Sequence, residues 1–293
     1  MMDDDFKATR VSTITVVCPS NLHVDHAWLY DSIRITEFEW ASEVKDDAGF
    51  QKRLIQENPP FGTITMAKYK TFNKGFRHVK KPPFRNNIVM NVYVGKLISV
   101  KIPVEGKIHF SGCKEDIHYE RFFEMFCRHL STEKSSPTTW FITDSSPLSF
   151  YILNISHNMV KDTGLKINRV RLNQFMNQQT PYRAIYIPSG NPGVKIRIDL
   201  EINHDELMIK RIRPDDTNQL CIDYIPYQEY LDTPLPCKFE YKNTGRKKNK
   251  NTFFIFHSGK VNMYGLIPYV NRDYKRLLKI LYDNRQHIEY TTI

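Results

Sequence analysis

One pattern of glycines, strand and helix occurs twice in the 293-residue chain. The first copy is GKIHFSGCKEDIHYERFFEMFCRHL, residues 106–130, and the second is GKVNMYGLIPYVNRDYKRLLKIL, residues 259–281. Each copy begins with a glycine turn, continues as a strand of alternating hydrophobicity to a second glycine, and ends in an amphipathic helix. Because self-similarity at a distance is typical of a repeated unit, the sequence predicts two related halves.

The two closing helices carry one-sided apolar stripes with helical spacing. The first stripe is Tyr119, Phe122, Phe123, Phe126, Cys127 and Leu130, and the second is Tyr274, Leu277, Leu278 and Leu281. Stripes at this spacing are typical of a helix that packs on a core. We therefore interpret both as core rather than as cofactor sites.

A polar, turn-rich segment, LSTEKSSPTTW at residues 130–140, separates the two halves. Each half reads as strand, helix, several strands and a closing helix, which predicts the α+β class. The predicted halves are 10–133 and 134–293, and the second contains a polar insertion around 201–250. This insertion ends in GRKKNKN, a basic run that fits either a solvated loop or a phosphate contact.

The chain is basic, with a formal net charge of +10 and a pI near 9.2. An excess of this size favours an anionic partner, and nucleic acid is the commonest one, although the charge could also serve solubility alone. No apolar run approaches the roughly 18 residues of a membrane helix, and MMDDDF does not resemble a signal peptide. We therefore expect a soluble intracellular protein.

The sequence lacks the signatures of the common enzyme and metal sites. There is no phosphate-binding loop, no GxSxG elbow and no HExxH motif, so we expect no enzymatic activity. The five cysteines form no CxxC pair, and His23 with His26 has no second ligand pair, so we expect buried free thiols, no metal and no cofactor.

Alternation assigns a face to each strand of the repeated unit. In the first half Ile98, Val100, Ile102, Ile108 and Phe110 form the predicted core face, and Leu97, Ser99, Lys101, Pro103, His109 and Ser111 lie opposite. In the second half the core face is Phe253, Ile255, Val261 and Met263, opposite Phe254, Phe256, Asn262 and Tyr264. Leaving each exposed phenylalanine in water costs about 2 kcal/mol, so we expect either the insertion or a ligand to cover them.

The segments FIFHSGKVNMYG, residues 254–265, and KIPVEGKIHFSG, residues 101–112, resemble the TATA-binding protein family. The chain looks most like the divergent TBP-like proteins of large nucleocytoplasmic DNA viruses. The resemblance implies a pseudo-twofold saddle, in which a curved antiparallel sheet carries helices on its convex face. It also implies a transcription initiation factor whose concave face binds and bends AT-rich double-stranded DNA from the minor groove, with phenylalanine wedges between base steps.

Only some wedge positions match the family. Phe256 matches one wedge and Phe61, in PFGTITM, matches another, whereas Pro103 and Asn191 stand at the remaining two. Thr13 stands where the family has an asparagine at the centre of the groove. We therefore expect contact through aromatic wedges in the second half and through charge in the first. The predicted DNA-binding residues are Phe61, Phe254, Phe256, Lys101, His109, Ser111, Asn262, Tyr264, Thr13, Thr15, Lys107 and Lys260.

The resemblance further implies a monomer that works with a TFIIB-like factor and RNA polymerase. It places the protein in the host cytoplasm, in a viral factory, or in the nucleus, or packaged in the virion. The alternative is a protein-interaction platform of the transcription machinery that has the same fold and bends DNA little or not at all.

Overall fold

The structure is a computed structural model that describes residues 10–36, 42–45, 51–54, 59–75, 87–103, 106–132, 140–142, 147–190, 192–217, 219–241, 249–266 and 269–290. It divides the chain into two compact units. The N unit contains Val16–Leu153 and Met208–Phe239, and the C unit contains Met1–Thr15, Asn154–Leu207 and Glu240–Ile293. The chain passes between the units four times: inside the two long strands β1 (Arg10–Pro19) and β11 (Phe150–Asp162), and again after Leu207 and after Phe239.

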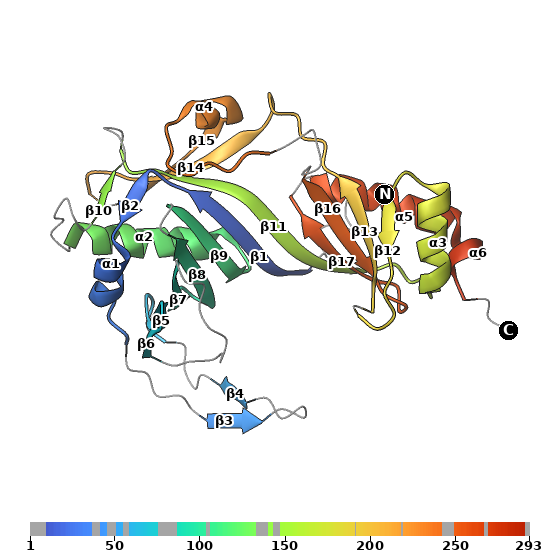
Figure 1. The fold of residues 1–293 in the computed structure, drawn as a ribbon, viewed down its shortest axis with the longest axis horizontal. Coiled ribbons are helices and arrows are strands. Elements are labelled where there is room, and N and C mark those ends of the chain that lie inside the picture. The colour runs from blue at the N-terminus through green and yellow to red at the C-terminus, as the bar shows by residue number, and fades with distance from the viewer. Residues whose placement is uncertain are drawn as a thin grey trace. The chain divides into compact units, whose positions relative to one another are not determined.

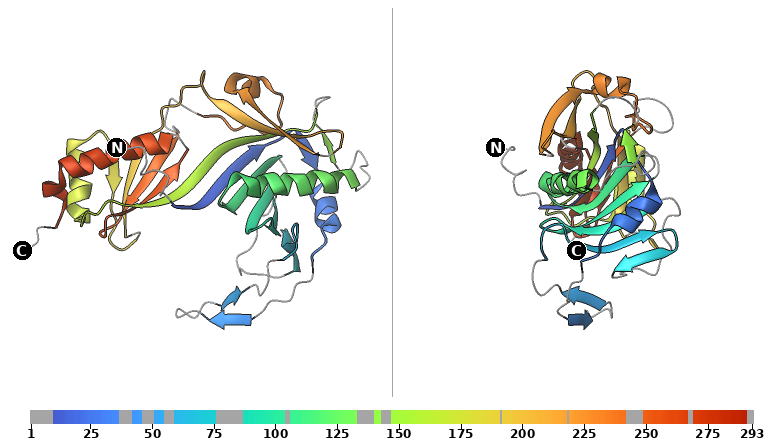
Figure 2. Two further views of the ribbon diagram at one scale, coloured as in Figure 1. Left: turned by 180° about the vertical axis from the view of Figure 1, so that it is seen from behind. Right: turned by 90° about the vertical axis from the view of Figure 1, so that its left-hand side faces the viewer.

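The N unit is built on an antiparallel sheet whose strands follow β1 in the order β9 (Lys107–Cys113), β8 (Leu97–Pro103), β7 (Asn87–Tyr93), β5 (Ile64–Tyr69) and β6 (Phe72–Gly75). Helix α2 (Asp116–Thr132) runs across one face of these strands (Figure 2, left). Its predicted stripe is fully buried, and Phe110 of β9 packs edge-on against Phe122 and Phe123 with ring centroids 5.2 Å apart.

Shorter elements complete the N unit. Helix α1 (His26–Ser32) begins at Asp25, whose carboxylate accepts the backbone N–H of Trp28, and packs on β5 and β7. Strand β2 (Leu22–Val24) pairs with β10 (Trp140–Ile142), and β3 (Ser42–Lys45) pairs with β4 (Gln51–Leu54).

The C unit repeats this plan. Its strands follow β11 in the order β17 (Lys260–Gly265), β16 (Lys250–Ile255), β13 (Val194–Asp199) and β12 (Arg183–Ile185) (Figure 1). Helices α3 (Arg169–Gln179) and α5 (Tyr269–Asp283), followed by the short α6 (Arg285–Ile288), supply the other half of its core. The predicted α5 stripe is confirmed, because Tyr274, Leu277 and Leu281 are buried.

In both units, the same two hydrogen bonds attach the hairpin before the closing helix to the residue that follows the first long strand. Ser20 directly follows β1, and its backbone N–H and hydroxyl both donate to the carbonyl of Gly106, at 3.0 and 2.8 Å. Thr163 directly follows β11 and donates the same two hydrogen bonds to the carbonyl of Gly259, at 3.0 and 2.9 Å. The N-unit sheet has one strand more, β6, but the shared order of the other strands and the same pair of hydrogen bonds explain why the glycine motif occurs twice. The predicted α+β class is confirmed.

The segment Met208–Phe239 belongs to the N unit, although the sequence analysis placed it in an insertion of the second half. It forms β14 (Met208–Pro214), β15 (Leu220–Pro226) and α4 (Tyr227–Asp232), and β14 pairs with Phe150–Ile152 of β11. Lys210 attaches the segment to α2, because its Nζ contacts Asp116 at 3.2 Å, the Tyr119 hydroxyl at 3.3 Å and the Glu120 carboxylate. Burial lowers the pKa of Lys210, but the two carboxylates outweigh burial and raise it overall.

Gly259 has no room for a side chain. Its φ is +86°, and a Cβ there would stand 2.3 Å from the Leu165 carbonyl oxygen. Gly164 has a similar φ of +72° but nothing within 4 Å, so it is the matched control. We expect Gly164→Ala to lower the free energy of unfolding by about 1–2 kcal/mol, the cost of the left-handed backbone alone. Gly259→Ala should lower the free energy of unfolding clearly more, as measured by urea denaturation. Equal losses in the two variants would contradict the attachment of the hairpin described above.

Lys210→Met should destabilise the N unit, because it leaves two carboxylates beside a buried surface without their cation. Removing one partner of a buried ion pair costs about 3 kcal/mol or more. The control is Lys250→Met, which breaks the more exposed 3.2 Å pair with Asp199 and should cost less than about 1 kcal/mol. Thermal and urea denaturation of both variants measure the difference, and a loss for Lys210→Met no larger than the control would refute the anchoring role.

Candidate nucleic-acid interface

The sheet of the C unit has one buried face and one open face, as the alternation predicts. Phe253, Ile255, Val261 and Met263 are buried in the core with α3 and α5. The open face, here called the C face, consists of side chains that point the other way and are half-buried or exposed: Arg183, Ile185, Lys195, Arg197, Thr252, Phe254, Asn262 and Tyr264. Strand pairing places Lys195, Phe254 and Asn262 in one row across β13, β16 and β17.

Phe254 is held at the centre of the C face. Its ring meets Tyr264 edge-on at 5.6 Å between centroids, and the Lys195 ammonium lies 5.5 Å from its centre. Phe256 follows at the end of β16 in the hairpin turn, where its backbone N–H donates to the Lys260 carbonyl at 2.9 Å. Both phenylalanines are half-buried. The C face therefore presents an aromatic strip with a cation at its side.

The open face of the N-unit sheet is polar at its centre and apolar toward one side. The polar part, here called the N face, consists of Lys68, Val89, Asn91, Ser99, Lys101, His109 and Ser111, all half-buried, and Met66, Tyr93 and Leu97 continue the same side of the sheet. The core strand residues predicted opposite are all buried. Pairing sets Lys101 beside His109 and Ser99 beside Ser111. Burial, with the positive charges of Lys107 and Lys101, lowers the pKa of His109. The imidazole is therefore neutral at pH 7 and offers one donor and one acceptor.

Acidic residues are almost excluded from both sheets. Among the described strands β1, β5, β6, β7, β8 and β9 of the N unit there is no Asp or Glu. In the sheet strands of the C unit the acidic residues are Asp162 and Asp199, each at the end of its strand. Asp199 pairs with Lys250, and Asp162 stands opposite Lys260. Because these two carboxylates stand at strand ends beside lysines, the other lysines and arginines give the open faces a positive potential.

The structure brings the predicted site residues together in two sets. Phe254, Asn262 and Tyr264 share the C face, with Phe256 at its turn, whereas Lys101, His109 and Ser111 share the N face. Thr13 and Thr15 lie on the open side of β1, on either side of the buried Ile14.

Phe61 lies apart from these faces, whereas Lys107 and Lys260 begin strands β9 and β17 on the same side as His109 and Asn262. Phe61 is 50% exposed and lies beside Arg121 of α2, with its ring 5.8 Å from the guanidinium. Lys107 donates to the Lys238 carbonyl at 3.5 Å, and Lys260 is exposed. Asn191 lies outside the described residues.

Sequence reasoning missed the contribution of β13 to the C face. Lys195 was not among the predicted residues, although the alternation in VKIRID puts Lys195 and Arg197 on the face opposite Ile196. The scarcity of acidic residues was also readable once the strands were delimited. The sequence of each strand indicated which of its residues share a face, but it did not indicate which strands are neighbours in the sheet.

The described part of the chain gives less support to a metal site or a membrane span. There, no three His, Cys, Asp or Glu side chains come close enough together to hold a metal ion. Within the same residues, every helix is too short or too polar to cross a membrane. None of the five cysteines forms a disulfide; Cys18, Cys113 and Cys127 are buried as expected, but Cys221 is exposed in β15 and Cys237 is half-buried.

Comparison with known proteins gives one named similarity. No family model matches the chain, and no curated protein matches it. Among solved structures, the chain is similar to the TBP of Methanococcus jannaschii, with 16% identity and a TM-score of 0.44 over 95% of this chain and 98% of that one.

The lowered pKa of His109 predicts an acid-sensitive fold. The unfolded state binds a proton near the ordinary pKa of about 6.5, whereas the folded state binds it only at lower pH. The free energy of unfolding should therefore fall as pH drops below about 6.5. Urea denaturation of the wild type and of His109→Gln across this range measures the effect, and the variant should show the shallower pH dependence. An identical pH dependence in both proteins would contradict the assignment.

Proposed function

We propose that the chain is a TBP-like transcription initiation factor that binds AT-rich double-stranded DNA through the open faces of its two sheets and bends it. The observation that carries this proposal is the C face, where Phe254 and Phe256 lie on an open sheet surface beside the basic side chains of Lys195 and Arg197. The repeated strand order and hairpin fastening support the resemblance of the two glycine motifs to that family. They also support the proposal of two copies, 10–133 and 134–293, apart from Met208–Phe239, which packs in the N unit.

The C face suits a widened minor groove. Aromatic side chains that enter between base steps replace base stacking, and they kink the duplex toward the major groove. Phe254 and Phe256 are close in sequence but stand on strand and turn, and Tyr264 supports the first of them edge-on. Asn262, next to Phe254 across the pair of strands, can meet the acceptors of A·T pairs with its amide.

The N face suits electrostatic contact. Lys101 and neutral His109 supply donors for minor-groove acceptors, and Ser99 and Ser111 supply hydroxyl groups. No aromatic wedge stands among these side chains. We therefore propose that DNA binding is asymmetric: wedges act in the C unit, and lysine contacts act in the N unit. By the same resemblance, a TFIIB-like factor and RNA polymerase are the proposed protein partners.

One observation favours the second candidate, a protein-interaction platform without strong bending. Phe61, the predicted wedge of the first half, lies beside α2, and Pro103 occupies another wedge position at the end of β8. A single pair of wedges unstacks less DNA than two pairs do. The two candidates therefore differ in DNA bending, which can be measured directly.

Phe254→Ala and Phe256→Ala should each weaken binding to an AT-rich duplex and reduce its bend. Alanine in place of a stacking aromatic costs about 1–3 kcal/mol, or roughly 5- to 150-fold in affinity. Lys101→Ala should lower the dependence of affinity on salt, between about 50 and 200 mM, by about one counterion. Fluorescence anisotropy gives the affinity, and energy transfer between end-labelled strands gives the bend.

The matched control for these variants is Phe72→Ala, which removes a 60% exposed phenylalanine of the edge strand β6 outside both faces. It should leave affinity and bend unchanged. If the wild type binds DNA but neither C-face variant changes the bend, the wedge assignment is wrong. If the wild type binds no duplex and captures only transcription proteins, the platform function replaces the proposal.

A further inference from the structure

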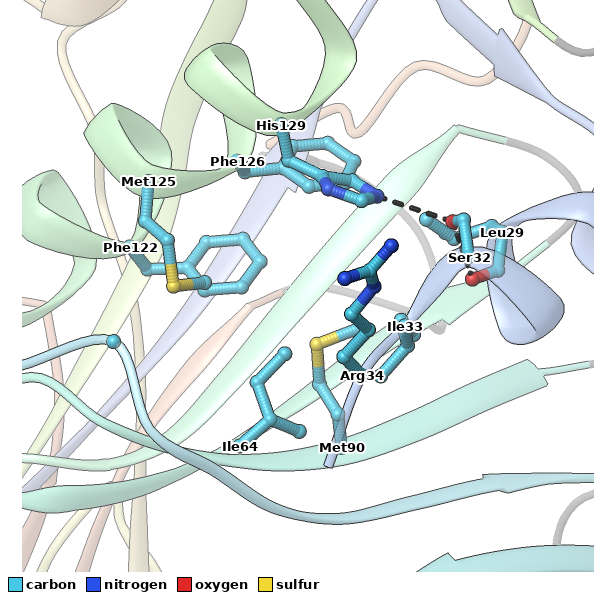
Figure 3. A pocket seen from close by; sticks show the side chains of 11 residues that line it. Leu29, Ser32, Ile33, Arg34, Ile64, Met90, Phe122, Met125, Phe126 and His129 are labelled. Atoms are coloured by element: carbon cyan, nitrogen blue, oxygen red, sulfur yellow. Dashed lines mark hydrogen bonds between the residues drawn. The ribbon is translucent and has the colours of Figure 1, made fainter. Parts of the chain in front are cut away.

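A cavity of about 230 Å³ opens inside the N unit, on the helix side of its sheet. It lies between α1, α2 and strands β5 and β7 (Figure 3). Its walls are apolar and are formed mainly by Ile33, Ile64, Met90, Phe122, Met125 and Phe126. The N face points away from the helices, so an occupant of this cavity leaves the proposed DNA contact open.

The mouth of the cavity is polar and basic. The exposed Arg34 extends its guanidinium toward His129 (Figure 3), and the His129 Nε2 lies 3.1 Å from the Ser32 hydroxyl. The Trp28 ring stacks on the His129 ring, with 6.3 Å between their centroids. No Asp or Glu lines the cavity, and among the described residues Arg34 has no carboxylate partner.

The volume of the cavity and the charge at its mouth together determine which ligands it can bind. Sites for small molecules usually enclose about 300–1,000 Å³, so this cavity is small for one and suits a single large side chain. Met90 and Met125 have flexible thioethers that adapt to the shape of an inserted ring. The exposed guanidinium of Arg34 at the mouth attracts a carboxylate next to that ring, because guanidinium and carboxylate form paired hydrogen bonds.

We propose that this cavity is the anchor pocket for an aromatic side chain of an acidic segment in a partner protein. The ring enters between α1 and α2, and a neighbouring carboxylate of the segment binds Arg34. Buried aromatic anchors of this kind carry much of the binding energy of protein interfaces. The proposal does not depend on DNA binding, since the pocket and the N face lie on opposite sides of the sheet.

The test uses the full chain labelled with ¹³C at its methionine methyl groups. The probe is a short acidic peptide with one central tryptophan, and its twin carries alanine instead. The tryptophan peptide should shift the Met90 and Met125 signals, whereas Met159 and Met176, buried in the core of the C unit, should not move. The alanine twin should bind about tenfold more weakly or worse.

Charge variants test the role of Arg34. Arg34→Glu and the milder Arg34→Gln should weaken peptide binding, the first by about tenfold or more. The control is Arg128→Glu, an exposed arginine of α2 that does not line the cavity and pairs only with Glu124 of its own helix. It should leave peptide affinity unchanged, and all three variants should bind the AT-rich duplex as the wild type does.

Three results would overturn the proposal. The first is a tryptophan peptide that moves neither Met90 nor Met125, and the second is equal binding of the two peptides. The third is full displacement of the peptide by free indole-3-acetate at equal concentration, because the pocket would then be a site for a small carboxylate. A loss of DNA binding in the C-face variants would leave the pocket proposal intact, so the two proposals fail separately.

Discussion

In each unit, one glycine carbonyl attaches the hairpin before the closing helix to the end of the first long strand. In the N unit Gly106 accepts two hydrogen bonds from Ser20, and in the C unit Gly259 accepts two from Thr163. This arrangement brings the last hairpin against the first strand, although they are separated by 86 and 96 residues. The backbone of Gly259 passes so close to that of Leu165 that only glycine fits. Strand order, the buried stripe and the open face follow from this attachment.

The two open faces share one backbone plan and differ in side chains. At the hairpin strand that precedes the turn glycine, the C unit carries Phe254 where the N unit carries polar residues such as Lys101 and Ser99. The buried face shows no such divergence, because a helix stripe must pack on it in both units. Two sheets built on one plan can therefore differ in the side chains of their open faces, while packing constrains the side chains of their buried faces.

Much of the fold could be predicted from the sequence, because hydrophobic periodicity reports burial directly. The stripe of α2 and the alternation of β8, β9, β16 and β17 are confirmed residue by residue. The place of Met208–Phe239 in the N unit could not be predicted, because it rests on strand pairing of β14 with β11 and on the ion pair of Lys210 with α2, both between residues far apart in the sequence. Nor was the position of Phe61, which depends on how a glycine turn meets Met125. The strand faces of the site could be predicted, but the neighbours of each strand could not.

The order of the two units along the chain affects how the protein folds during its synthesis. The N unit draws its β14–β15 hairpin from residues that follow a large part of the C unit in the sequence. The sheet and α2 emerge from the ribosome long before Lys210 can neutralise Asp116 and Glu120. Until about the first 240 residues have been translated, the nascent chain keeps this side of α2 uncovered.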